Sequence, residues 1–210
     1  MRTSRLIAYA GLALVTLVAA GSSCPTEPKI KTRFVDLAVG QSVTLDFPAT
    51  GSTNTFTSGN VAVRLDQSIN LPQAIAAAGI DVSSLKSITL AGVSYRVSVA
   101  DPTSGRTVTS GSVQVAVNSN PMVDLIDNFS GAADKVTGWI TPSLDSLGVD
   151  QINALLASEL PQIQNDQNPP ETLTYNVSGV STPTDVATSF TYELRLTLSI
   201  VGTVKTKVLS

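Results

Sequence analysis

The sequence predicts a mainly β protein: an antiparallel β-sandwich that carries a few short helical insertions. Three observations lead to this prediction. Apolar and polar residues alternate in many windows after residue 33, which is the pattern of a strand with one buried face. Val and Thr are abundant, and both favour pleated, half-buried surfaces. Helical patterns are few, whereas a doubly wound sheet would need a helix after nearly every strand.

The first expected strands form a hairpin. Residues 34–39 place Val35, Leu37 and Val39 on one face, and residues 42–47 do the same with Val43, Leu45 and Phe47. Gly40 and Gln41 lie between them as the expected turn. A shorter strand is expected next, where Val61, Val63 and Leu65 alternate with polar or small residues.

A strand over residues 88–99 is expected to contain a β-bulge. Ile88 and Leu90 are even-numbered, whereas the apolar residues from Val93 to Val99 are odd-numbered. One inserted residue at Ala91-Gly92 would keep both sets on the same face of the sheet.

Two further strands complete the predicted sheet. The first covers residues 113–117, with Val at each odd position. The second covers residues 190–200, where six apolar residues occupy consecutive even positions. Because this is the longest apolar stripe in the chain, we expect residues 190–200 to form a central strand.

Three short helices interrupt the strands. The first is expected over 71–78, after a cap at Asn70 and before a stop at Gly79. The second is expected to begin at Asn120-Pro121, because Met122, Leu125, Ile126 and Phe129 follow at helical spacing. The third is expected over 150–160, where Pro161 should interrupt it.

The N-terminal segment has the composition of an export signal. Arg2 and Arg5 precede 15 uncharged residues, 6–20, and small residues follow up to Cys24, the single cysteine of the chain. A transmembrane helix needs about 20 strongly apolar residues, so a retained signal anchor is the weaker interpretation. An unpaired cysteine in an exported protein is reactive unless a modification consumes it.

Residues 20–24, Ala-Gly-Ser-Ser-Cys, resemble the lipobox of bacterial lipoproteins, with Gly21 at the position where Leu is usual. The resemblance implies cleavage before Cys24, diacylation of its thiol and acylation, for example by palmitate, of the new α-amine. Two or more acyl chains give stable membrane anchoring. By the same resemblance, Pro25 in place of Asp favours the outer membrane. The alternative is cleavage after Ala20, which would leave Cys24 a free thiol in a periplasmic or secreted protein.

The expected organisation is a signal at 1–23, a Pro-rich tether at 24–33 and one β-sandwich domain at 34–210. Without Arg2 and Arg5 the chain carries 11 basic and 16 acidic side chains, a net charge of −5. This balance argues against a nucleic-acid partner, which a basic face would attract. The chain has no His, which removes Ser-His and Cys-His nucleophiles and His-ligated metals. No cofactor motif occurs, so no cofactor is expected.

Two groups of residues resemble catalytic motifs, and both have a structural explanation that we prefer. Ser83 and Lys86 match the Ser-x-x-Lys of penicillin-binding proteins, but the companion motifs are missing, so we expect Ser83 to cap a helical turn. Asp124 and Asp127 could act as a pair on a helix, but they are expected on its solvated face.

Two other groups are candidate ligand sites. Residues 165–168 are the nearest approach to a calcium loop and hold one carboxylate, which is too few for a cation site. Trp139, the only Trp, is expected to pack at the edge of the sandwich rather than to form a sugar platform.

These observations leave two hypotheses for function. The first is a non-enzymatic lipoprotein of the cell envelope, attached to the membrane through Cys24, whose domain binds an envelope protein or glycan or has a structural role. The alternative is a His-free hydrolase that acts on envelope polysaccharide through two carboxylates 5–10 Å apart in a cleft, at about the spacing that glycosidases use.

Overall fold

The computed structural model describes residues 30–51, 53–64, 70–77, 79–167 and 171–209. The expected signal at 1–23 and the first six residues of the expected tether, Cys24 among them, lie outside this part of the chain. The remaining four residues of that tether belong to the first strand, which begins at Ile30. No helix in the described part of the chain is long and apolar enough to span a membrane.

The described residues are mostly strand, as the sequence predicted. In chain order the strands are β1 (Ile30–Gly51), β2 (Thr55–Thr57), β3 (Val61–Arg64), β4 (Leu85–Val99), β5 (Thr107–Val117), β6 (Val123–Ala132), β7 (Thr172–Thr182) and β8 (Thr188–Leu209). The helical elements are α2 (Leu71–Ala77), the 3-10 turn η1 (Val82–Ser84) and α3 (Ser146–Gln164).

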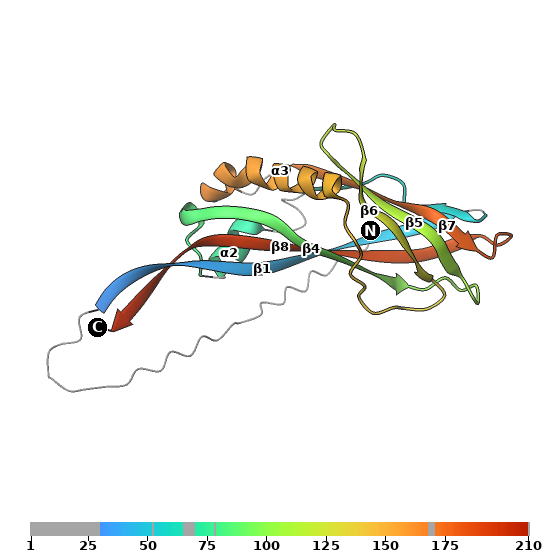
Figure 1. Cartoon of the computed structure of the whole chain (residues 1–210), viewed down its shortest axis with the longest axis horizontal. Coiled ribbons are helices and arrows are strands. Elements are labelled where there is room, and N and C mark those ends of the chain that lie inside the picture. The colour runs from blue at the N-terminus through green and yellow to red at the C-terminus, as the bar shows by residue number, and fades with distance from the viewer. Residues whose placement is uncertain (1–29, 52, 65–69, 78, 168–170, 210) are drawn as a thin grey trace.

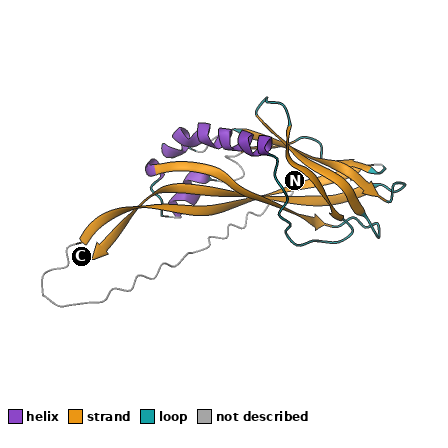
Figure 2. Ribbon diagram, viewed as in Figure 1, coloured by secondary structure: helices purple, strands orange, loops and turns teal. Residues whose placement is uncertain are grey.

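All eight strands belong to one antiparallel sheet in the order β4-β8-β1-β2-β7-β5-β6, with β3 also paired to β7. The sheet curls until its two ends share one core. Phe129 of β6 packs on Tyr95 of β4 and Tyr192 of β8, with ring centroids 5.4 and 4.8 Å apart. The long helix α3 lies along one side of this curled sheet, and the ends of β1 and β8 project beyond it (Figures 1 and 2).

The hairpin expected at Gly40-Gln41 is wrong, because β1 is a single strand from Ile30 to Gly51. Gly40 and Gln41 pair with Ser199 and Leu198 of β8 as part of an uninterrupted register. Val35, Leu37 and Val39 before this dipeptide and Val43, Leu45 and Phe47 after it are all odd-numbered, so a straight strand keeps them in one phase and needs no turn.

The two best-patterned strands agree with their predictions. β8 lies between β4 and β1, and the even-numbered residues from Phe190 to Ile200 are all buried. β4 pairs with β8 and carries a register shift between Leu90 and Gly92, where the bulge was predicted. Because of this bulge, Leu90 and Val93 are both buried, although one is at an even and the other at an odd position of the strand.

The helix expected after Pro121 is wrong, because residues 123–132 form strand β6. Leu125, Ile126 and Phe129 are buried as expected, but three irregularities in the β5–β6 register produce their spacing. Phe129 lies opposite Gly111, Ile126 opposite Val113 and Asp124 opposite Gln114. Bulges of this kind interrupt the alternation of buried and exposed residues along a strand. In β6 the buried residues therefore occur at the spacing expected of an amphipathic helix.

The other two helices form close to their predicted positions. Asn70 caps α2, with its side chain accepting a hydrogen bond from the Gln73 amide. α3 runs from Ser146 to Gln164, so the expected end at Pro161 is wrong. Pro161 lies within the last turn of α3, so the helix continues for three residues beyond it although Pro lacks a backbone donor, and the Asn165 side chain donates to the Pro161 carbonyl at 2.9 Å.

Polar contacts connect α3 to the strands beneath it. The Asn153 side chain accepts a hydrogen bond from the Leu90 amide at 2.7 Å, and Gln164 Nε2 donates to the Leu85 carbonyl at 2.7 Å. At the start of the helix, Gly148 lies against the backbone of Asp124 and Leu125, where a Cβ would not fit. These contacts place one face of α3 over β4, β5 and β6.

A hollow between α3 and β7

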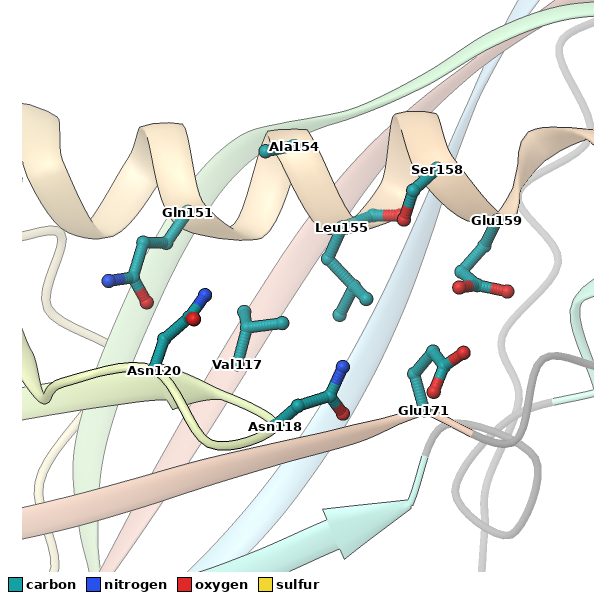
Figure 3. Close-up of a pocket in the computed structure, with 9 residues that line it drawn as sticks. All are labelled: Val117, Asn118, Asn120, Gln151, Ala154, Leu155, Ser158, Glu159 and Glu171. Carbon is teal, nitrogen blue, oxygen red and sulfur yellow. The ribbon is translucent and has the colours of Figure 1, made fainter.

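A hollow of about 350 Å³, open to solvent, lies between α3 and the strand ends beside it (Figure 3). Its walls are the end of β5 and the turn after it, one face of α3, and the residue before β7. The lining residues are Val117, Asn118, Asn120, Gln151, Ala154, Leu155, Ser158, Glu159 and Glu171.

The helical period explains which side chains of α3 line the hollow. Gln151, Leu155 and Glu159 recur every four residues and therefore lie on one face of the helix. Leu155 and Val117 are both buried and form an apolar floor between the polar ends of the hollow.

At one end of the hollow the carboxyl groups of Glu159 and Glu171 face each other (Figure 3). Glu159 is only 4% exposed, and no donor group among the described residues reaches its Oε2 atom. Burial, then the hydrogen bond and negative charge of Glu171, raise the pKa of Glu159 to about 7. Neither carboxyl has an ion pair with a Lys or Arg in the described part of the chain. Glu159 therefore holds a proton at pH values where an ordinary glutamate is ionised.

The other end of the hollow holds the Gln151 carboxamide. Its Nε2 donates to the Pro121 carbonyl at 3.3 Å, which determines the orientation of the amide because only the nitrogen of a carboxamide can donate to a carbonyl. Gln151 Oε1 is consequently turned toward Asn120, where it is buried and has no hydrogen-bond partner (Figure 3). Both ends of the hollow thus present a buried acceptor without a donor.

The residues that resembled catalytic motifs do not assemble into a site. Asp81, not Ser83, caps the turn η1, and it accepts hydrogen bonds from both the backbone and the hydroxyl of Ser83. Asp124 accepts a hydrogen bond from Gln114 at 3.1 Å, while Asp127 is exposed on the same strand. The expected turn is present at Ser83, but its cap is a different residue.

Residues 165–168 and Trp139, the two candidate ligand sites, do not form a binding site among the described residues. Asn165 caps the C-terminus of α3, and Asn168 lies outside the described residues. Among the residues that the structure describes, no three His, Cys, Asp or Glu side chains gather where a metal could bind. Trp139 lies beside the edge strand β4, as predicted, and its ring is covered by the guanidinium groups of Arg96 and Arg195, 4.7 and 3.7 Å from the ring centroid.

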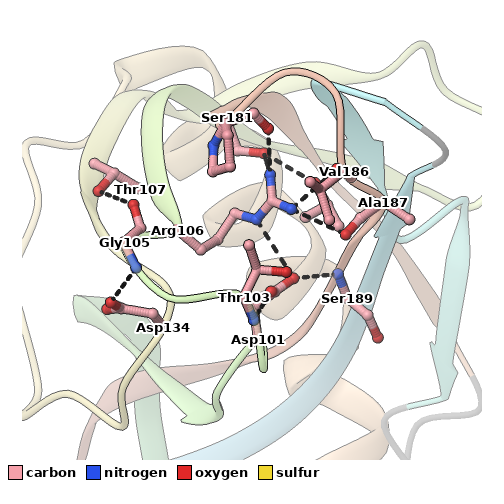
Figure 4. A network of polar contacts seen from close by, with 12 residues as sticks. Asp101, Thr103, Gly105, Arg106, Thr107, Asp134, Ser181, Val186, Ala187 and Ser189 are labelled. Atoms are coloured by element: carbon pink, nitrogen blue, oxygen red, sulfur yellow. Dashed lines mark hydrogen bonds and ion pairs between the residues drawn. The ribbon is translucent and has the colours of Figure 1, made fainter.

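A second buried polar cluster surrounds Arg106 at the far end of the sandwich (Figure 4). Arg106 Nε lies 3.5 Å from the Asp101 carboxylate, and both side chains are fully buried. The guanidinium also donates to the carbonyls of Pro183, Val186 and Ala187 at 2.8 to 3.0 Å. Because these carbonyls belong to the β7–β8 loop, the cluster joins that loop to the β4–β5 loop and has a structural role.

The sequence did not point to Glu159, Glu171 or Arg106 as members of polar clusters. One signal for Glu159 was present: it follows Ile152, Leu155 and Leu156 at the apolar phase of α3, where an acidic side chain is unusual. Glu171 and Arg106 stand in polar loop sequences, and their surroundings depend on segments distant in the chain.

No protein-family model and no curated protein matches the chain. Among solved structures, Desmodium yellow mottle tymovirus matches at 10% identity over 100% of this chain and 98% of that chain, with a TM-score of 0.32. The decameric BFDV capsid protein matches at 11% identity over 80% of this chain and 99% of that chain, with a TM-score of 0.27.

Proposed function

We propose that the protein is a lipid-anchored lipoprotein of the bacterial cell envelope, with a non-catalytic β-sandwich domain that binds a partner or has a structural role. The observation that carries the proposal is the sequence around Cys24: a basic start, a short uncharged segment, small residues and then the only cysteine. Acylation gives that cysteine a use and gives the domain an attachment to the membrane. Pro25 favours the outer membrane.

The described domain supports a binding role more than a catalytic one. Its most unusual polar feature is the Glu159–Glu171 pair in the hollow beside α3. The two carboxyl groups face each other at one end of this hollow, and neither is ion-paired with a Lys or Arg in the described part of the chain. Two acidic groups placed in this way are suited to holding a cationic ligand.

Expression in a bacterial host with labelled palmitate tests the anchor. We expect label in the wild-type protein and recovery of the protein with the membrane fraction. Cys24→Ala should lose the label and remain as an unprocessed precursor, whereas Ser22→Ala, which keeps a small residue, should behave as wild type. An unlabelled, soluble wild-type product would contradict the proposal.

The alternative function is a carboxylate-dependent hydrolase of envelope polysaccharide, in which Glu159 and Glu171 would be the candidate acid and base. This alternative requires that the wild-type protein release soluble sugar from isolated cell-wall or capsular material. It also requires that Glu159→Gln abolish the release while Asp127→Asn, which removes an exposed carboxylate, retains it. Absence of release by the wild-type protein would eliminate the alternative for the polysaccharides tested.

A further inference from the structure

We propose that the hollow between α3 and β7 binds an aliphatic diamine or polyamine, with one ammonium group at the Glu159–Glu171 pair and a second donor at Gln151. This proposal rests on the binding role proposed above and adds the chemical class of the ligand, but it does not depend on the membrane anchor at Cys24.

The carboxyl pair needs a positive charge. Glu159 is 96% removed from solvent, its Oε2 receives no hydrogen bond, and no Lys or Arg of the described chain pairs with it or with Glu171. Glu159 is buried and has lost its hydration, and the half-buried Glu171 beside it adds a negative charge, so either a proton or a bound cation must compensate Glu159. An ammonium group supplies both the charge and three hydrogen-bond donors.

The far end of the hollow also needs donors. The bond from Gln151 Nε2 to Pro121 leaves Gln151 Oε1 as a buried acceptor without a partner. Both unpaired atoms in the hollow are therefore acceptors, and the best-suited ligand is one that only donates at its two ends. Eight residues of helix separate Gln151 from Glu159, a rise of about 12 Å, which suits a chain of the length of spermidine.

The floor between the two ends is apolar. Val117 and Leu155 are buried there, with Ala154 beside them on α3. Methylene groups that cover this floor would be removed from water, and the inner ammonium group of a polyamine such as spermidine would stay hydrated because the hollow is open to solvent. A hydrated metal ion would leave most of the hollow unfilled. Calcium takes six to eight oxygen ligands, and two carboxylates supply too few of them.

Calorimetric titration of the full-length protein with spermidine at pH 8 tests the proposal. We expect one saturable site, and weaker binding of hexylamine, which has a donor at one end only. Glu159→Gln should weaken spermidine binding at least about tenfold, as expected for the loss of a buried charge partner. Asp127→Asn removes an exposed carboxylate and should bind as wild type. Gln151→Leu should weaken spermidine binding but leave hexylamine binding unchanged.

The proton on the carboxyl pair gives a second readout. Burial and the neighbouring Glu171 raise the pKa of Glu159 to about 7, so Glu159 is mostly protonated at pH 6 and mostly ionised at pH 8. Because the ammonium group must replace this proton, the affinity for spermidine should be about tenfold lower at pH 6 than at pH 8. Spermidine itself stays charged over this range. Thermal unfolding of each variant checks that it folds, and Glu171→Gln replaces Glu159→Gln if the latter does not.

Four results would overturn the proposal. Wild-type protein that does not bind spermidine would refute it, and equal loss of binding in Glu159→Gln and Asp127→Asn would indicate attraction by net charge alone. Saturable calcium binding that excludes spermidine would assign the pair to a metal. Binding of a capped lysine as tight as that of spermidine would assign the site to a lysine side chain of a partner. The titration repeated with Cys24→Ala separates failure of this site from failure of the anchor.

Discussion

Arg106 and Asp101 form an ion pair that is fully buried at one end of the sandwich, with 3.5 Å between Nε and the carboxylate. The Asp101 carboxylate also accepts hydrogen bonds from the amides of Thr103 and Ser189, and the Arg106 backbone bonds with Ala133. Three loops that are distant in the sequence therefore meet at this pair. Removing one member leaves the other charge buried and uncompensated.

Replacement of Arg106 should be among the most destabilising changes in the domain. We expect Arg106→Met to lower the free energy of unfolding by about 3 to 5 kcal/mol, as for other buried pairs that lose one partner. The double variant Arg106→Met, Asp101→Asn should recover part of this loss because the orphaned charge is gone. Urea unfolding measures both. A double variant whose loss equals the sum of the two single losses would show that the pair is not coupled.

Asp101 should make the domain sensitive to acid. Burial alone would raise the pKa of Asp101, but hydrogen bonds from Ser189 and Thr103 and the charge of Arg106 outweigh it, and the pKa is lowered from 3.8. The folded state therefore keeps this carboxylate ionised at a pH where the unfolded chain protonates it. Stability from this group is complete above about pH 4 and is lost as the pH falls further. Asp101→Asn should show a smaller loss of unfolding free energy between pH 5 and pH 2 than the wild type.

Glu159 should have the opposite effect at higher pH. Its pKa is raised from 4.5 to about 7, so between these values the folded chain holds a proton that the unfolded chain has released. Stability of the ligand-free protein should fall as the pH rises through this window, by roughly 1 to 3 kcal/mol in total. Glu159→Gln should remove this dependence, whereas Asp127→Asn should retain it. Equal slopes in wild type and Glu159→Gln, measured by urea unfolding at pH 5 and pH 8, would contradict the account.

The contact between Gly111 and Phe129 predicts a steric effect. A Cβ at position 111 would overlap the Phe129 ring, which packs against Tyr95 and Tyr192 in the core. Gly111→Ala should therefore reduce the free energy of unfolding by about 1 to 3 kcal/mol, as overpacking does. Adding Phe129→Leu should relieve the overlap, so the two changes together should cost less than the sum of each alone.

The register of β8 predicts a contrast between adjacent positions. Leu196 is buried and pairs in register with Val43 of β1 and Val93 of β4, whereas Thr197 lies on the opposite face and is half-buried. Leu196→Asp should abolish the cooperative unfolding transition, because it places a carboxylate without a partner in the core. Thr197→Asp should retain the transition. Similar circular dichroism melting curves for the two variants would show that the register is wrong.

The sequence predicted the fold best where the period of two is unbroken or broken once. The stripe from Phe190 to Ile200 and the bulge beside Gly92 are both present as expected. Where several irregularities fall in ten residues, as in β6, the same apolar residues gave a helical pattern. The Gly40-Gln41 dipeptide suggested a turn, but its long pairing with β8 is a tertiary contact that local sequence does not encode.

Buried polar groups were harder to predict than strands. Arg106 stands in a polar loop sequence, and its burial comes from the β7–β8 loop, about 80 positions further on. Glu159 and Glu171 are separated by the end of α3 and the loop after it, so only the folded chain brings their carboxyls together. An acidic residue on the apolar face of α3 was the one local signal of this site.

The mass of the N-terminal peptide tests the central claim of a lipid anchor most directly. Protein purified from bacterial membranes and digested with trypsin should yield a first peptide that begins at Cys24 and carries the added mass of a diacylglyceryl group and an N-linked acyl chain. The same digest of Cys24→Ala should yield no such peptide. A wild-type peptide that begins at Gly21 with an unmodified Cys24 thiol would contradict the account.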